Sequence, residues 1–265
     1  MKLTAANADR HDLYQRSVQD VESEIEFVDT TFKKLRGRFA QVLREDFCGT
    51  ANTCCQWVRQ RDDNRGIGVD LDAEVLSWGT NNNIAQLSPD QAARVELLQR
   101  DVRETDDGGL DIVLAMNFSY FLFETRADML RYFVSVFESL RDDGIFFLDC
   151  YGGYDAPRVL TEERECDGFT YIWDQASFNP ISSLMQCYIH FTFEDGSRMD
   201  KAFAYHWRLW TLPELLGLLQ DAGFSRTTVY WEGTDEETGE GDGIYTPATV
   251  GDADAGWICY LTAEK

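Results

Sequence analysis

The chain has 265 residues, of which 47 are acidic and 24 are lysine or arginine, so its formal net charge at pH 7 is −23. Nucleic-acid binding depends on a cationic surface, and this charge argues against DNA or RNA as the main partner. With 44% hydrophobic residues, the chain is long enough to bury a sizeable core as one domain that carries an insertion.

The sequence also bears on compartment and metal binding. No run approaches the roughly 18 apolar residues of a membrane-spanning helix, and the first residues lack the apolar stretch of a secretory signal. The seven cysteines lie mostly in apolar segments, and none has the CxxC spacing of a zinc site. We therefore expect a cytoplasmic protein with no membrane partner and no structural metal.

The first predicted elements are two helices between Asp12 and Leu35, where apolar residues recur at helical spacing. They belong to a helical segment, residues 1–40, that precedes the first strand. We expect this segment to form a unit of its own in front of the core.

A strand, a tight turn and a helix follow. A short apolar run ends at Leu43, and residues 51–59 return to helical spacing after a turn that contains Gly49. Glycine lets backbone N–H groups and a helix N-terminus approach a ligand without an intervening Cβ. The next strand, Gly66–Asp70, ends in a carboxylate, which in nucleotide sites accepts hydrogen bonds from ribose hydroxyls. The alternative is an ordinary turn at Gly49 and a helix N-cap at Asp70.

The core continues with alternating helices and strands, as in a parallel sheet with right-handed crossovers. In chain order we expect a helix at Ala73–Gln86, strands at Arg94–Leu98 and Leu110–Asn117, a helical pattern at Phe118–Leu140 that breaks near Thr125, a turn at Arg141–Gly144 and a strand at Ile145–Cys150.

From Gly168 the pattern changes to aromatic segments with strand-like alternation, and later returns to a helix and strands. The alternating segments are Phe169–Trp173, Met185–Phe193 and Ala202–Trp210. They predict an antiparallel sheet, residues 167–210, inserted over the carboxyl ends of the core strands. After it come a helix that begins at Thr211, strands at Thr227–Trp231 and Trp257–Ala263, and between these two strands a loop, Glu232–Asp254.

Together these elements predict an α/β fold. We expect a doubly wound, mostly parallel sheet of seven strands, formed by residues 41–166 and 211–265. The helical segment at residues 1–40 and the inserted sheet at residues 167–210 would flank this core.

Four strings carry a resemblance to a known family. They are LYQRSVQ (Leu13–Gln19), REDFCGTA (Arg44–Ala51), NFSYF (Asn117–Phe121) and WRLWTLPE (Trp207–Glu214). With the order of the elements, they resemble the Rossmann-like, class I S-adenosylmethionine-dependent methyltransferases, and more narrowly a bacterial subgroup without an assigned substrate. The usual first motif has flanking glycines where this chain has Phe47 and Ala51. The G-x-G-x-x-G pattern of dinucleotide sites is absent, which makes a nicotinamide cofactor a weaker expectation.

The resemblance implies a set of cofactor-binding positions, with the helical segment as a lid. They are Tyr14, Arg44, Glu45, Phe47, Cys48, Gly49, Asp70, Leu71, Asp101, Val102 and Asn117. In this family the acid that corresponds to Asp101 hydrogen-bonds the adenine amino group, and Gln19 would join Tyr14 near the methionine end or the substrate. Two alternatives stay open: Tyr14 is a packing aromatic, or Arg44 and Glu45 pair with each other.

Methyl transfer from a sulfonium is a direct displacement, so the protein has mainly to align the acceptor and exclude water. Tyr120, after the fourth strand, is the candidate to contact the acceptor, and His206 is a candidate base unless it is structural. We expect a small-molecule methyltransferase with an N or O acceptor. The rivals are a non-catalytic protein on this fold that binds S-adenosylmethionine or a partner, a Rossmann oxidoreductase, and an enzyme that methylates protein side chains.

Overall fold

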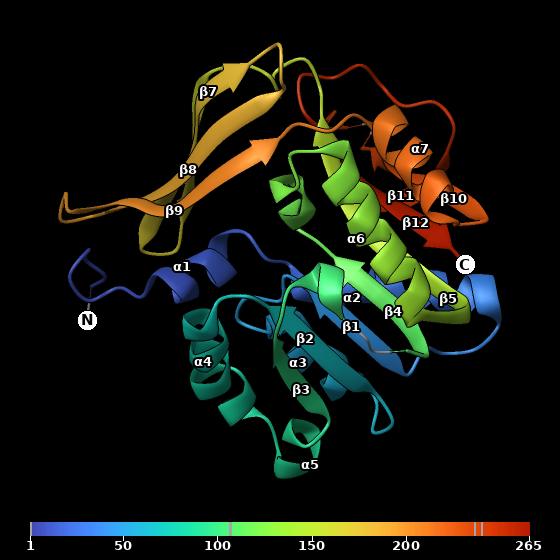
Figure 1. Cartoon of the computed structure of the whole chain (residues 1–265). Helices are drawn as coiled ribbons and strands as arrows, with labels where there is room; N and C mark the ends of the chain where they lie inside the picture. Colours follow the sequence, from blue (N-terminus) through green and yellow to red (C-terminus); the bar gives the residue numbers. More distant parts are fainter. Residues whose placement is uncertain (1, 106–107, 236, 240) are drawn as a thin grey trace.

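One large mixed sheet forms the core of the fold. The computed structural model describes residues 2–105, 108–235, 237–239 and 241–265, and within them the main sheet has eight strands in the order β11-β10-β12-β5-β4-β1-β2-β3 (Figure 1). They are β1 (Val42–Asp46), β2 (Arg65–Asp70), β3 (Val95–Gln99), β4 (Leu110–Ala115), β5 (Leu140–Gly152), β10 (Arg226–Thr234), β11 (Gly241–Ala248) and β12 (Trp257–Glu264).

The pairing of the strands shows where the sheet changes direction, which is where a ligand site is expected. β1 lies parallel to both β2 and β4, β2 pairs in parallel with β3, and β4 with β5. β12 runs antiparallel to β5 and to β10. The chain reverses its direction across the sheet between β1 and β4, and ligands of doubly wound sheets bind outside the strand ends at such a point. The predicted α/β fold with a doubly wound, mostly parallel sheet is thus confirmed.

Seven helices are present in the described residues, and helices cover both faces of this sheet. They are α1 (Arg10–Ser17), α2 (Val21–Arg36), α3 (Asn52–Gln60), α4 (Ala73–Asn82), α5 (Pro89–Ala92), α6 (Arg126–Ser139) and α7 (Leu212–Ala222), with short 3-10 turns η1 (Ile84–Gln86), η2 (Val102–Glu104) and η3 (Ser119–Leu122). Alternate β4 residues enter different cores: Ile112 and Leu114 pack with α2 and α3, and Val113 and Ala115 with α6 and α7. This alternation is what a strand buried on both faces requires.

Three boundaries differ from the prediction. The helix after β2 ends at Asn82, and η1 follows as a separate turn. The predicted turn at Arg141–Gly144 is wrong, because these residues belong to β5, whose register with β4 shifts there. The predicted loop after β10 contains β11, an exposed edge strand that pairs with β10 and raises the strand count above seven. β11 holds two glycines and Pro247, which are tolerated at an edge but give no strand signal.

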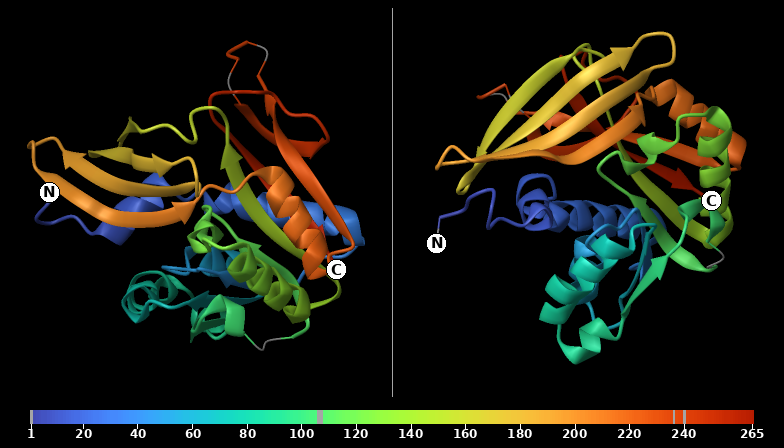
Figure 2. Two further views of the ribbon diagram at one scale, coloured as in Figure 1. Left: turned by 45° about the horizontal axis from the view of Figure 1, so that its top comes forward. Right: turned by 60° about the vertical axis from the view of Figure 1, so that its left-hand side comes forward.

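A second sheet lies between β5 and α7 in the chain. Within the described ranges it has four antiparallel strands in the order β6-β7-β8-β9: β6 (Leu160–Cys166), β7 (Phe169–Asn179), β8 (Leu184–Phe193) and β9 (Arg198–Arg208). β6 was not predicted, because its central residues are exposed and do not alternate. Figure 2 shows this small sheet projecting from the core with α1 beneath it. Leu13 of α1 packs into its apolar face with Ile189 and Phe191.

No helix in the part of the chain that the structure describes is both long and apolar enough to cross a membrane.

Candidate active site

The turn after β1 has the backbone shape of a glycine-rich loop. Phe47, Gly49 and Ala51 have φ angles of 59°, 50° and 56°, all in the left-handed region. Two of them are not glycine, and a left-handed conformation costs an ordinary L-residue about 1–2 kcal/mol. Phe47 and Ala51 thus adopt, despite this cost, the left-handed conformation that glycine adopts readily. The N–H of Cys48 donates to the carbonyl of Val69 at 3.0 Å and ties the turn to β2.

Asp70 joins this turn to the end of β2. Its carboxylate accepts hydrogen bonds from the N–H of Gly49 at 2.8 Å and from the N–H of Asp72 at 2.9 Å. Burial raises the pKa of Asp70, and these hydrogen bonds oppose the rise. The N-cap of α4 is Asp72, whose side chain accepts from the N–H of Glu74. Asp70 is therefore not the helix cap of the alternative interpretation.

The neighbouring strand ends supply an apolar and an acidic side chain. Leu71 is 65% exposed directly after β2. Asp101 follows β3, caps η2 and forms an ion pair with Arg103 at 2.6 Å. The pKa of Asp101 lies below its usual value because Arg103 hydrogen-bonds it. Val102 is buried beneath them.

Arg44 and Glu45 point to opposite faces of β1. Arg44 is fully buried, and its guanidinium bonds to Asp46 at 2.8 Å and to the hydroxyls of Thr105 and Ser139. Glu45 accepts from the N–H of Cys54 at 3.2 Å in the first turn of α3, and burial raises its pKa to about 7. Successive residues of a strand face opposite ways, so Arg44 and Glu45 cannot pair. The side chain of Arg44 is therefore held by partners inside the protein and is not exposed at the turn.

The loop after β4 is fixed by an acid that the sequence interpretation missed. The carboxylate of Asp149, near the end of β5, accepts from the N–H of Asn117 at 2.7 Å and from that of Phe118 at 2.9 Å. Both donors have positive φ, which orients their N–H groups toward the carboxylate. Burial raises the pKa of Asp149 to about 7. The one feature of the sequence that could have pointed to Asp149 is that an acid lies near the end of a predicted strand.

Tyr120 does not reach the site. Its side chain is fully buried, and its hydroxyl donates to the backbone carbonyl of Asp149. The structure thus makes it a core residue that supports β5, in contrast to its predicted contact with the acceptor.

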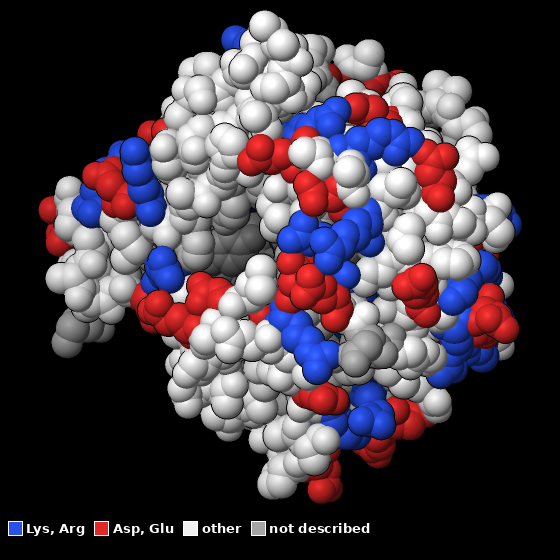
Figure 3. Space-filling view, in the orientation of Figure 1, with Lys and Arg blue, Asp and Glu red and all other residues white. Residues whose placement is uncertain are grey.

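The small sheet faces this loop with aromatic rings. Tyr205 and Trp207 of β9 lie 4.6 Å apart, and Trp173 of β7 lies 5.9 Å from Trp207. The ring of Phe118 packs 6.4 Å from Trp207 and 4.7 Å from Tyr151. Figure 3 shows the surface hollowed between the small sheet and the core, with charged side chains on the rim. A cluster of aromatic side chains can bind an apolar or cationic small molecule.

His206 lies on β9 between these two rings in sequence, and therefore on the other face of the strand. Its side chain is half-exposed, and its Nδ1 lies 2.7 Å from Oε1 of Glu124. The structure does not bring it to the aromatic face.

Helix α1 covers the site from the N-terminal side. The hydroxyl of Tyr14 is hydrogen-bonded to that of Tyr205, and the centroid of its ring lies 5.0 Å from that of Phe203, so Tyr14 packs against β9 of the small sheet. Gln15 accepts hydrogen bonds from the Thr50 hydroxyl at 2.8 Å and from the side-chain amide of Asn83 at 2.7 Å.

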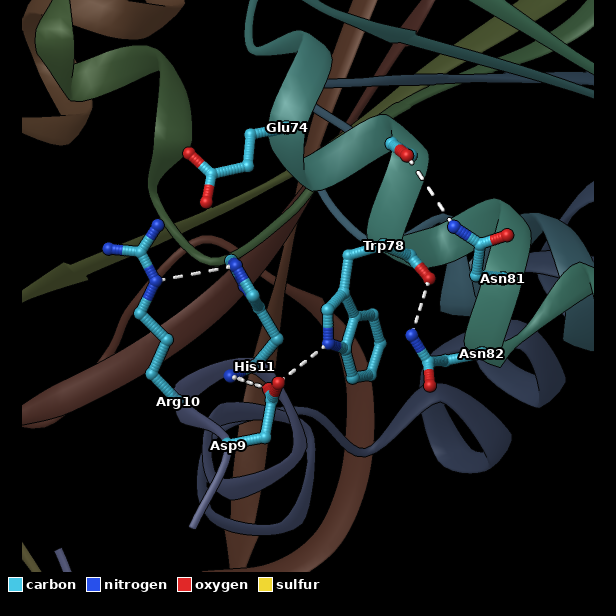
Figure 4. A pocket seen from close by; sticks show the side chains of 8 residues that line it. Asp9, Arg10, His11, Glu74, Trp78, Asn81 and Asn82 are labelled. Atoms are coloured by element: carbon cyan, nitrogen blue, oxygen red, sulfur yellow. Dashed lines mark hydrogen bonds between the residues drawn. The ribbon is translucent and has the colours of Figure 1, made fainter. Parts of the chain in front are cut away.

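The residues that flank α1 make two further contacts with the core. Gln19 accepts from the side-chain amide of Asn52 at 3.2 Å. A groove of about 340 Å³ lies between α1 and α4. There the indole N–H of Trp78 donates to Asp9 at 2.9 Å (Figure 4). None of the predicted site residues lines this groove. Helix α1 and the residues that flank it are thus held to the turn after β1, to α3 and to α4.

Within the residues described, no cluster of three or more His, Cys, Asp or Glu side chains is arranged to hold a metal ion.

Comparison with known proteins defines the class. No protein-family model matches the chain. A crystal structure of an S-adenosylmethionine-dependent methyltransferase from Clostridium acetobutylicum superposes with a TM-score of 0.70, 19% identity and 96% coverage of each chain. The S-adenosylmethionine-bound amino pentose methyltransferase CalS10 from Micromonospora echinaspora superposes with a TM-score of 0.67, 15% identity and the same coverage. The fold is that of a class I S-adenosylmethionine-dependent methyltransferase.

One known protein is also similar in sequence. The Bacillus subtilis (strain 168) protein with the name "Putative methyltransferase YqeM" is 27% identical over 176 residues, which cover 64% of this chain and 68% of that protein.

Proposed function

We propose that the chain is an S-adenosylmethionine-dependent methyltransferase that acts on a small-molecule acceptor through nitrogen or oxygen. The observation that carries this proposal is the hydrogen bond from Gly49 to Asp70, because it joins the turn after β1 to the acid after β2 at the switch point of the sheet. The relative and the superposed methyltransferases support the same activity.

The residues fit the cofactor. A Cβ built on Gly49 meets nothing within 4 Å, so the space in front of the turn is open to a ligand. The turn would hold the amino-acid end, Asp70 the ribose hydroxyls, and Leu71 with Asp101 the adenine. When bound, S-adenosylmethionine supplies an electrophilic methyl group on a sulfonium. Asn117 and Phe118, held by Asp149, would border the transferred methyl group.

The acceptor would lie in the hollow. Trp173, Tyr205 and Trp207 would orient it, and Tyr14 on α1 would cover it, so that water is kept from the reacting atoms. CalS10 is described as an amino pentose methyltransferase, which agrees with a compact polar acceptor.

Calorimetric titration of an Asp70→Ala variant with S-adenosylhomocysteine tests the assignment. We expect an affinity loss of about tenfold or more, because a charge-assisted contact is removed. Asp72→Ala is the matched control, because it removes an acid two residues away that only caps α4. If Asp70→Ala binds as tightly as the wild type, Asp70 is not the cofactor acid.

A further inference from the structure

Glu24 of α2 is a buried acid outside the residues that would hold the cofactor. Its side chain is nine-tenths buried, and its Oε2 has no hydrogen-bond partner among the described residues. Burial raises its pKa well above the usual value, and the acids Asp149, Glu45 and Asp20 raise it further. A buried carboxylate without a partner is costly, so such groups are candidates for function.

Glu24 lies near the end of β5. Three residues further along α2, the ring of Phe27 stacks on that of Tyr260 of β12, with 4.6 Å between the ring centroids. Tyr260 pairs with Asp149 across β12 and β5. These two strands are adjacent in the sheet, whereas the acid that ends β2 lies on the other side of β4 and β1. Glu24 therefore belongs with Asp149, which holds the loop after β4.

We propose that Glu24, supported by Asp149, binds the protonated amine of the acceptor and removes one of its protons. This inference rests on the proposed function and selects nitrogen as the methylated atom. An ammonium has no lone pair to share, so it must lose a proton before it can react. An acid that is buried, unpaired and surrounded by other acids is a strong site for a cation, and the aromatic face adds cation–π attraction.

In the proposed step, proton transfer to Glu24 precedes methyl transfer. The ammonium gives one proton to the Glu24 carboxylate and becomes a neutral amine. Its nitrogen lone pair forms a bond to the methyl carbon while the carbon–sulfur bond breaks, and that electron pair stays on sulfur. The products are S-adenosylhomocysteine and a methylated ammonium, and the proton on Glu24 then leaves to solvent. The acceptor class is thus a small primary or secondary amine with an apolar or ring portion for the aromatic face.

Sinefungin is the probe for this site, because it carries an amine where S-adenosylmethionine carries the methyl sulfonium. Affinities of sinefungin and S-adenosylhomocysteine are measured by calorimetry on wild type, Glu24→Gln and Glu26→Gln. Glu26 is an exposed acid on the same helix and serves as the matched control. We expect Glu24→Gln to lower the preference for sinefungin about tenfold or more, with S-adenosylhomocysteine binding unchanged. Glu26→Gln should leave both affinities as they are.

Other outcomes overturn the inference. If Glu24→Gln weakens both ligands equally, Glu24 binds the amino-acid end of the cofactor; if it weakens neither, it holds no amine. Failure of the wild type to bind either ligand would refute the proposed function instead.

A measurement on the wild type alone does not depend on how the variant folds. The preference for sinefungin should rise with pH as Glu24 ionises next to Asp149, Glu45, Asp20, Tyr14 and Tyr260. A preference that is flat or falls as the pH rises also overturns the inference.

Discussion

Replacing Gly49 by alanine separates the backbone strain of the turn from its role at the cofactor. Gly49 has a φ of 50°, and a Cβ built on it meets nothing within 4 Å. The variant therefore has no clash in the free protein, and its stability loss is the left-handed penalty of about 1 kcal/mol. For a chain of this size that lowers the melting temperature by about 2–4 °C.

Ligand binding should respond far more strongly. The added methyl group occupies the open space in front of the turn, where the account places the amino-acid end of the cofactor. We expect the affinity for S-adenosylhomocysteine to fall about tenfold or more, equivalent to about 1.4 kcal/mol or more. Calorimetric titration measures the affinity, and thermal unfolding monitored by circular dichroism measures the stability.

Gly37→Ala is the matched control. Gly37 ends α2 with a φ of 70°, and a Cβ there also meets nothing within 4 Å. It should lose a similar amount of stability and keep its cofactor affinity. The reasoning is refuted if Gly49→Ala binds as tightly as Gly37→Ala.

Two further predictions concern buried charges. Arg44→Met leaves Asp46 buried without its cation, so the free energy of unfolding measured in urea should fall by about 3–5 kcal/mol; a loss below about 1 kcal/mol would contradict the pairing. Asp149→Asn tests a pH effect. Burial raises the folded-state pKa of Asp149 to about 7, above its unfolded value, so its contribution to stability falls as pH rises from about 4 to 7. As the pH rises from about 5 to 8, the free energy of unfolding of the variant should therefore fall less than that of the wild type, by on the order of 2 kcal/mol. Equal losses would contradict this assignment.

The sequence was informative where a local pattern determines the structure. The strand, turn and helix around Gly49 and the acid at the end of β2 were predicted, because period, glycine and strand-end chemistry are local signals. The break before α6 was predicted at Thr125, which caps that helix. The capping box between Thr211 and Glu214 likewise marked the start of α7.

Features set by pairing over long distances were not predictable in this way. Arg44 reads as a polar strand-end residue, yet its partners Thr105 and Ser139 lie 61 and 95 residues away. Tyr120 follows a strand end like a site residue, and only the packing of β5 and α6 buries it. Glu24 looks like one of several acids on a solvated helix, because nothing local shows that it faces the end of β5.

Calorimetric titration of the wild-type protein with S-adenosylmethionine and S-adenosylhomocysteine, with NAD as the comparison ligand, tests the central claim most directly. The account predicts micromolar binding of the two sulfur compounds and no binding of NAD. Binding of neither sulfur compound would contradict the enzyme assignment and favour a protein that uses this fold for contacts with a partner. Binding of NAD instead would favour an oxidoreductase.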